Sequence, residues 1–191
     1  MADEKDYGAL KPDGHMNTRS LMRVNLNEPH PDTINIHDIA YGIGFKPHYS
    51  GQTPYFFSVA QHSVLVAELV YRETNDPIKA IVGLFHDSEE AYIGDMITQI
   101  KLMFPGFKEL AIKIQKVIFE KYGLPFELLP EIKWADIQIL QTEFRIFYRM
   151  TPTERESFFK NNPGYERIGP EEAAELFLQK YSHFKKLLAL K

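Results

Sequence analysis

Residues 83–95 read GLFHDSEEAYIGD, an order that predicts one helix with an apolar beginning and a polar end. His86 and Asp87 stand side by side in the middle of this helix, directly after an apolar run. A histidine and a carboxylate beside a buried segment need partners, because an unpaired charge there is costly. A divalent metal ion is the simplest partner for both. Glu90 shares the helical face of His86, and Asp95 follows a helix-ending glycine, so its side chain can turn back toward the same site.

Two further segments complete a set of candidate metal ligands. His62 lies in FSVAQHS near the start of the preceding predicted helix, and Asp136 lies in IKWADI early in a later one. In chain order, 23 residues separate His62 from His86, and 48 residues separate Asp87 from Asp136. Two imidazoles and two carboxylates suit Mn, Fe, Co, Ni or Zn, with positions left for water or substrate. Any one of them alone reads better as a core histidine or a helix-surface group, so the set of four carries the prediction.

Composition predicts an ordinary globular protein. The chain has 191 residues, 44% of them hydrophobic and 25% charged, which favours one domain with a sizeable core. The net charge of −4 gives no basic footprint for a nucleic-acid polymer. Without cysteine there are no disulfides or thiolate metal sites, which fits a reducing cytoplasm. No apolar run approaches the ~20 residues that span a membrane, so we expect no membrane association.

Proline, glycine and helix-capping residues mark the boundaries of the predicted segments of the chain. Residues 1–33 are polar and rich in turn formers, which predicts an N-terminal arm with at most a short strand near residues 21–26. Residues 34–191 predict a single all-α domain. Its expected helices start after Asn35, Ser58, Asp76, Pro105, Pro130, Glu154 and Gly169.

Two local patterns refine this prediction. Ser58-Val59-Ala60-Gln61 is a capping-box pattern, in which the Ser58 and Gln61 side chains are both expected to bond the helix start. The helix after Pro130 has a broad apolar stripe that is expected to face the core. Its members are Ile132, Ile137, Leu140, Phe144 and Phe147.

Three blocks in order carry a family resemblance: SVAQHS at 58–63, HDSEEAYIGD at 86–95 and WAD at 134–136. Together they resemble the HD-domain metal-dependent phosphohydrolases, above all the bacterial 5′-deoxynucleotidases and their phage relatives. The resemblance covers roughly residues 34 to 150 and implies an HD-domain helical bundle.

The resemblance assigns roles to individual residues. It implies that the metal ligands are His62, His86, Asp87 and Asp136. It also implies that Glu90 is the general base or acid, and that Asp95 contacts the sugar hydroxyl and water near the phosphate. The alternative for Glu90 is a solvated helix residue without a catalytic role, a description that fits Glu89 better. The alternative for Asp95 is a helix-end or turn residue.

The number of metal ions follows from the histidines that are absent. No histidine lies between His86 and His183, whereas the two-metal branches of the superfamily need additional histidines after the His-Asp pair. We therefore expect one divalent metal ion (Co, Mn, Ni, Zn, Fe or Mg) and no oxidative chemistry. Glu143 shares a helix face with Asp136 and is expected to anchor the structure or support a ligand.

The predicted substrate contacts include one departure from the family. The family commonly has an arginine that binds phosphate, then an aromatic residue that packs against the sugar and disfavours a 2′-hydroxyl. Here His48 replaces the arginine and Tyr49 keeps the aromatic, with Lys46 as a candidate substitute cation. Lys101 stands where the family often places a lysine. The alternative for Lys101 is a solvated surface lysine, and for His48 a plain loop residue.

The resulting expectation is a deoxynucleotide phosphohydrolase. Phage relatives that resemble this chain remove dATP in phages with 2-aminoadenine genomes, which favours dATP, dADP and dAMP as substrates and deoxyadenosine as product. A general deoxynucleoside 5′-monophosphatase is the closest alternative. A catalytically silent nucleotide-binding HD module is the alternative of a different class. The resemblance further implies a homo-oligomer, a dimer or hexamer, in the cytoplasm, or in the host cytoplasm for a phage-encoded protein.

Overall fold

The computed structural model describes residues 13–190, and the predicted all-α class is confirmed. Residues 1–12 of the expected arm and the last residue of the expected domain lie outside the described residues. The helices are α1 (Ile36–Gly44), α2 (Val59–Thr74), α3 (Pro77–Phe85), α4 (Glu90–Ile93), α5 (Thr98–Lys101), α6 (Pro105–Tyr122), α7 (Leu129–Tyr148), α8 (Pro152–Asn161) and α9 (Pro170–Ala189). Short 3-10 turns are η2 (Pro31–Thr33), η3 (His48–Gly51) and η4 (Phe126–Leu128). The strands β1 (His15–Asn17) and β2 (Arg23–Asn25) form an antiparallel pair, with Met16 opposite Val24.

Helix ends follow the local signals in the sequence. The Asn35 side chain accepts a hydrogen bond from the backbone N–H of His37, and Asp76 does the same for Ile78. Both satisfy amide groups that a helix start leaves without a partner. Gly123 ends α6 with φ of +61°, a left-handed conformation that glycine adopts without steric cost. These three helix boundaries were predicted from the sequence.

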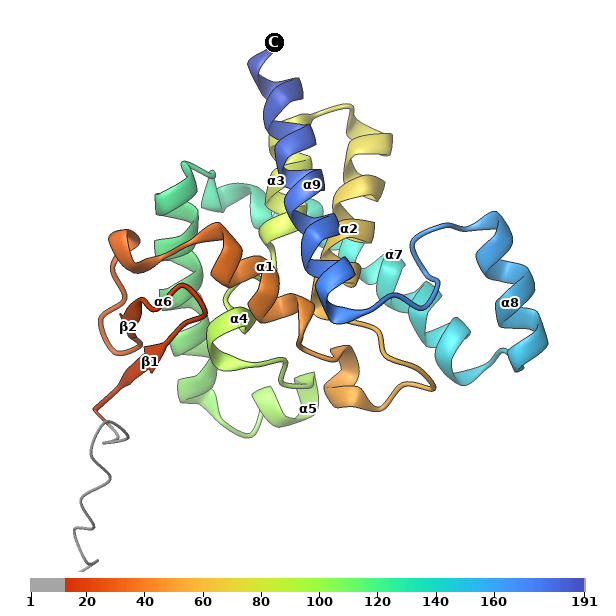
Figure 1. Cartoon of the computed structure of the whole chain (residues 1–191), viewed down its shortest axis with the longest axis horizontal. Coiled ribbons are helices and arrows are strands. Elements are labelled where there is room, and N and C mark those ends of the chain that lie inside the picture. Colours follow the sequence, from red (N-terminus) through yellow and green to blue (C-terminus); the bar gives the residue numbers. More distant parts are fainter. Residues whose placement is uncertain (1–12, 191) are drawn as a thin grey trace, which may run out of the picture.

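The helices α2, α3 and α9 pack against one another and form the centre of the molecule (Figure 1). Helix α1 packs on α9 and α4, and α7 packs across α2 and α3, while α8 stands at one end of the molecule (Figure 1). Phe85, at the end of α3, is fully buried with its ring 5.6 Å from that of Phe177 and 5.3 Å from that of Tyr181. This packing fixes the residue that immediately precedes His86.

The expected single helix over residues 76–94 is wrong, because the α-helix breaks after Phe85. The imidazole Nδ1 of His86 donates to the carbonyl of Gly83 at 2.7 Å, and Ser88 donates its backbone N–H to Phe85, three residues back. The chain resumes as α4 at Glu90. Across the break, Glu90 and Ala91 also donate their backbone N–H groups three residues back, to Asp87 and Ser88, so the chain is wound more tightly than an α-helix.

Two other local expectations also need correction. In the capping-box pattern, Ser58 accepts from the backbone N–H of Gln61, but the Gln61 amide instead donates to the carbonyls of Gly164 and Glu166, at 2.7 and 2.8 Å. On α7, Ile137 and Phe144 are 46% and 48% exposed rather than buried. The helix has more apolar positions than the core can cover, and the remainder line a cavity described below.

Gly42 lets α1 approach α4, the helix that begins with Glu90. A Cβ atom on Gly42 would lie 2.7 Å from the Ala91 Cβ atom and 3.0 Å from its Cα atom. We expect Gly42→Ala to lower the free energy of unfolding by about 1–3 kcal/mol, because overpacking must displace one helix. Urea denaturation of Gly42→Ala beside Gly106→Ala, whose Cβ would meet no atom within 4 Å, measures this effect. Equal stability of the two variants would contradict the close α1–α4 packing.

Candidate metal centre

Three of the predicted ligands, which are His62, His86 and Asp87, are close enough together to hold one metal ion, and Asp136 lies beside both imidazoles. His62 comes from the first turn of α2, His86 and Asp87 from the turn after α3, and Asp136 from α7. The Nε2 atoms of the two histidines lie 3.3 Å apart. Asp136 Oδ1 lies 3.2 Å from His62 Nε2 and 3.8 Å from His86 Nε2. Asp87 Oδ2 lies 3.1 Å from His86 Nε2 and 4.0 Å from His62 Nε2.

Hydrogen bonds on the far side of each ring fix which nitrogen faces the proposed metal site. His62 Nδ1 donates to Glu143 Oε1 at 2.8 Å, and His86 Nδ1 donates to the carbonyl of Gly83 at 2.7 Å. In the neutral rings, both Nε2 atoms therefore carry a lone pair directed at the other. Two lone pairs 3.3 Å apart repel one another unless a cation, either a proton or a metal ion, lies between them. The two carboxylate oxygens beside them favour the ion of higher charge.

The spacing of these atoms suits a divalent ion. Nitrogen and oxygen ligands about 2.1 Å from one ion lie roughly 3 Å apart when adjacent and roughly 4 Å apart when opposite. The separations at this site, from 3.1 to 4.0 Å, cover that range. Burial alone lowers the pKa of His86, but Asp87 and Asp136 raise it well above the usual value. Protons therefore compete with a metal ion here, and metal binding is expected to release them.

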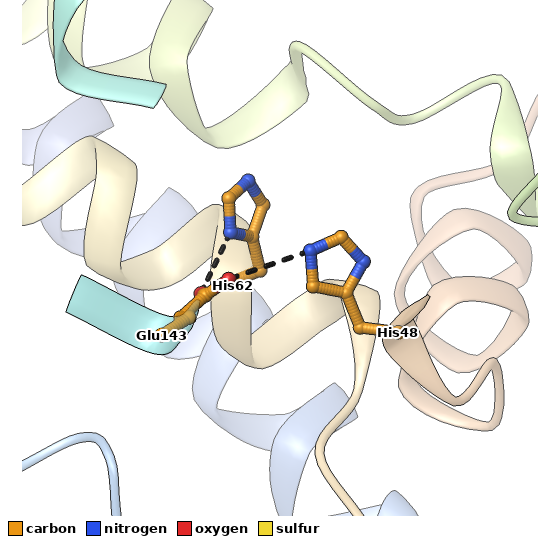
Figure 2. A group of neighbouring side chains, drawn as sticks. All are labelled: His48, His62 and Glu143. Carbon is orange, nitrogen blue, oxygen red and sulfur yellow. Dashed lines mark hydrogen bonds and ion pairs between the residues drawn. The ribbon is translucent and has the colours of Figure 1, made fainter. Parts of the chain in front are cut away.

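Glu143 connects the ligand His62 to a second buried histidine, His48 (Figure 2). Its Oε1 accepts from His62 Nδ1, and its Oε2 lies 3.5 Å from His48 Nε2 and accepts from the Tyr49 hydroxyl at 3.2 Å. His48, His62 and Glu143 are also close enough together to hold a metal ion. Because His62 Nδ1 is already bonded to Glu143, we interpret Glu143 as the hydrogen-bond partner that orients His62, the support role predicted for it.

Glu143→Gln distinguishes the two groups that are able to hold a metal ion. Glutamine can still accept from His62 Nδ1 but lacks the charge that makes the imidazole a stronger ligand. We expect a metal dissociation constant about 10–100-fold higher than in the wild type, measured by titration calorimetry with Co²⁺ or Mn²⁺. A complete loss of metal binding would instead place Glu143 among the ligands.

Glu90 is a second buried carboxyl group at this site that is not itself a proposed ligand. Its Oε1 accepts from Lys101 Nζ at 2.9 Å, whereas its Oε2 is buried without a hydrogen-bond partner. Burial raises the pKa of Glu90 well above its usual value, Asp87 and Asp95 raise it further, and Lys101 opposes them. A carboxyl group with a raised pKa is suited to take up and release protons near neutral pH.

The expectation that Glu89 is solvated is wrong. Glu89 is 7% exposed, and its Oε2 accepts from the side-chain amide of Gln115 on α6 at 3.1 Å. Burial and the neighbouring Asp87 raise the pKa of Glu89 to about 8. This contact with a residue of α6 has no signal in the local sequence around Glu89.

The turn η3 has an unusual backbone. Tyr49 and Ser50 both have positive φ, at +55° and +51°, and such left-handed conformations in residues other than glycine are costly. Asp95 accepts from the Ser50 backbone N–H and from His48 Nδ1, each at 3.3 Å. Burial alone lowers the pKa of His48, but the neighbouring Asp95 and Glu143 carboxylates raise it to about 10.

A cavity of about 740 Å³ opens beside the ligands, and most of the predicted site residues line it. The predicted residues on its wall are His48, Tyr49, His62, Asp87, Glu90, Asp95, Lys101 and Asp136. Lys46 is not among the lining residues, and His48 is engaged by carboxylates rather than free.

The cavity wall also includes residues that sequence reasoning missed. They are Gln52, Met96, Ile97, Thr98, Gln99, Lys133, Gln141 and Tyr148, together with Ile137, Leu140 and Phe144, which were expected in the core. Lys133 had a usable signal, because it precedes Asp136 by three residues and therefore shares its helical face. Residues 96–99, which lead into and begin α5, had no such signal in the sequence.

Within residues 13–190, no helix combines the length and the apolar character needed to cross a membrane.

Comparison with known proteins identifies relatives without stated functions. No family model matches the chain. It is 40% identical over 114 residues to "Uncharacterized protein YfdR" of Escherichia coli (strain K12), and the aligned region covers 60% of this chain and 61% of YfdR. It is also 40% identical over 122 residues to "Uncharacterized protein RCAP_rcc00048" of Rhodobacter capsulatus, and this aligned region covers 61% of this chain and 62% of that protein. The chain thus spans less than two thirds of both curated relatives, and neither name states an activity.

Proposed function

We propose that the protein is a divalent-metal-dependent phosphohydrolase that removes phosphate from deoxynucleotides. The observation that carries this proposal is a pair of imidazole Nε2 atoms 3.3 Å apart, each with a carboxylate beside it, next to a cavity whose wall includes Glu90. Metal ligands, a buried proton-transfer group and room for a substrate are the parts that phosphate hydrolysis requires.

The ligands proposed for one divalent ion are His62, His86, Asp87 and Asp136. When bound, such an ion polarises a phosphoryl oxygen and lowers the pKa of a water molecule. Glu90 takes the proton of the attacking water and returns it to the leaving oxygen, as its buried, unpartnered Oε2 atom permits. Lys101 holds the other carboxyl oxygen of Glu90 and so orients the group. Asp95, fixed by Ser50 and His48, is the proposed partner of the sugar hydroxyl and nearby water.

The cavity size and lining support a nucleotide substrate. A volume of about 740 Å³ lies in the range typical of small-molecule sites. Tyr49, Ile137, Phe144 and Tyr148 give the wall apolar and aromatic surface on which a sugar and base can pack. We propose dATP, dADP and dAMP as the favoured substrates, with deoxyadenosine as product, on the basis of the family resemblance. A cytoplasmic homo-oligomer, a dimer or hexamer, stays a prediction from the same source.

A turnover screen tests the proposal. The protein is stripped of metal, reconstituted with Co²⁺, Mn²⁺, Mg²⁺, Ni²⁺, Zn²⁺ or Fe²⁺ singly, and offered all ribo- and deoxynucleoside mono-, di- and triphosphates. Turnover of deoxyadenosine nucleotides including dATP is expected. Turnover of every deoxynucleoside monophosphate and no triphosphate would replace the substrate proposal with a general 5′-monophosphatase. Bound metal without any turnover would overturn the enzyme proposal and leave a nucleotide-binding module.

A further inference from the structure

A phosphate group in this cavity needs a cationic side chain beyond the metal ion, because phosphate oxygens are bound most strongly by charged donors. Among residues 13–190, those that line the cavity include no arginine, and their basic side chains besides the ligand His62 are His48, Lys101 and Lys133. Each of the three has a carboxylate partner, so the question is which of them remains able to donate to an anion.

His48 is not available for this role. Its Nδ1 lies 3.3 Å from Asp95 Oδ2, and its Nε2 lies 3.5 Å from Glu143 Oε2. The ring is buried, its Nδ1 is hydrogen-bonded to Asp95, and its Nε2 makes no hydrogen bond but lies within ion-pair distance of Glu143. An anion could reach His48 only by displacing Asp95 or Glu143, two groups that are themselves negatively charged.

Lys101 is held by the proton-transfer group. Its ammonium donates to Glu90 Oε1 at 2.9 Å, and the side chain is 35% exposed. The Glu90 carboxyl group is only 3% exposed, and its Oε2 atom already lacks a hydrogen-bond partner. If Lys101 moved away, both carboxyl oxygens would be buried without a partner, which is costly. Its geometry therefore fits orientation of Glu90 better than capture of an incoming phosphate.

Lys133 differs from both in exposure and in the atom it contacts. Its side chain is 64% exposed, and its ammonium donates to Asp136 Oδ2, while Asp136 Oδ1 faces His62. The ammonium thus lies beside the carboxylate of a proposed ligand, and Lys133 is one of the residues that line the cavity. A lysine has three donors, and the contact with Asp136 uses one of them.

We infer that Lys133 binds the phosphoryl group of the substrate next to the metal ion, an inference that rests on the proposed function. A metal ion held by Asp136 would take up part of the carboxylate charge and so would weaken its hold on Lys133. The ammonium then donates to Asp136 and to a phosphate oxygen together. Without the metal ion, the carboxylates of Asp87, Asp95 and Asp136 repel an anion, so phosphate binding requires the metal.

The experiment measures binding of inorganic phosphate to the full chain by titration calorimetry, with and without Mn²⁺. The wild type is compared with Lys133→Met, Lys133→Arg and the control Lys186→Met, an exposed lysine of α9 outside the cavity wall. With Mn²⁺ present, Lys133→Met is expected to bind phosphate about 10–100-fold more weakly, the usual effect of losing a hydrogen bond to a charged group. Lys133→Arg and Lys186→Met are expected to stay within about threefold of the wild type.

The outcomes separate this inference from the proposed function. Wild-type phosphate affinity in Lys133→Met, with nucleotide turnover present in the wild type, would overturn the inference and leave the function standing. The inference would also be overturned if Lys133→Met raised the dissociation constant for the metal as much as that for phosphate. Lys133 would then act by positioning the metal ligand Asp136 and not by binding phosphate. Absence of metal-dependent phosphate binding in the wild type, together with absence of turnover in the nucleotide screen, would overturn both.

Discussion

Replacing His86 by alanine is expected to abolish divalent-metal binding and metal-dependent turnover together. The substitution removes one of two imidazole nitrogens that face each other at 3.3 Å, and it also frees the Gly83 carbonyl that orients the ring. Loss of a partner that only orients a ligand weakens metal binding about 10–100-fold, so loss of the ligand itself should exceed that. Metal content after dialysis and titration with Co²⁺ measure the effect.

The matched control for this variant is His183→Ala. His183 is an exposed histidine of α9 and does not line the cavity, so the variant should bind metal and turn over substrate like the wild type. Circular dichroism of the two variants checks that both are folded. Retention of stoichiometric metal by a folded His86→Ala variant would remove His86 from the ligand set and with it the proposed centre.

Glu90→Gln should separate metal binding from chemistry. Glutamine keeps the size of the side chain and can still accept from Lys101, but it cannot take up the proton of the attacking water. We expect the metal dissociation constant to stay within about threefold of the wild type and turnover to fall by about a hundredfold or more. Steady-state rates on the substrate identified by the screen, with metal content measured in parallel, provide the comparison.

Glu89→Gln is the control for Glu90→Gln, because the two residues are neighbours with different surroundings. Glu89 contacts Gln115 rather than the cavity, and its pKa of about 8 keeps it largely protonated at neutral pH. A neutral amide therefore replaces a neutral acid, and turnover should be retained. Equal losses in the two variants would assign the effect to the packing of α4, and metal loss in Glu90→Gln would make Glu90 a ligand.

The sequence was sufficient for those features that local chemistry decides. Proline, glycine and capping side chains act on their own neighbours, so the starts of α1 and α3 and the end of α6 were predicted from Asn35, Asp76 and Gly123. The residue types His62, His86, Asp87 and Asp136, at their spacing, indicated a metal site, and their side chains do lie close together. The support role of Glu143 followed from its helical register with Asp136.

Only the tertiary structure decided how these groups are surrounded. Glu89, after the break at Phe85, is buried against Gln115, a residue from another helix. His48 is confined by Asp95 and Glu143, which lie 47 and 95 positions later in the chain. Contacts between elements so far apart in sequence leave no local pattern, because they are set by how helices pack and not by which residues are adjacent. The sequence by itself therefore determined the residue types and spacing that predict a metal site, and packing determined which of the other charged side chains are left to meet a substrate.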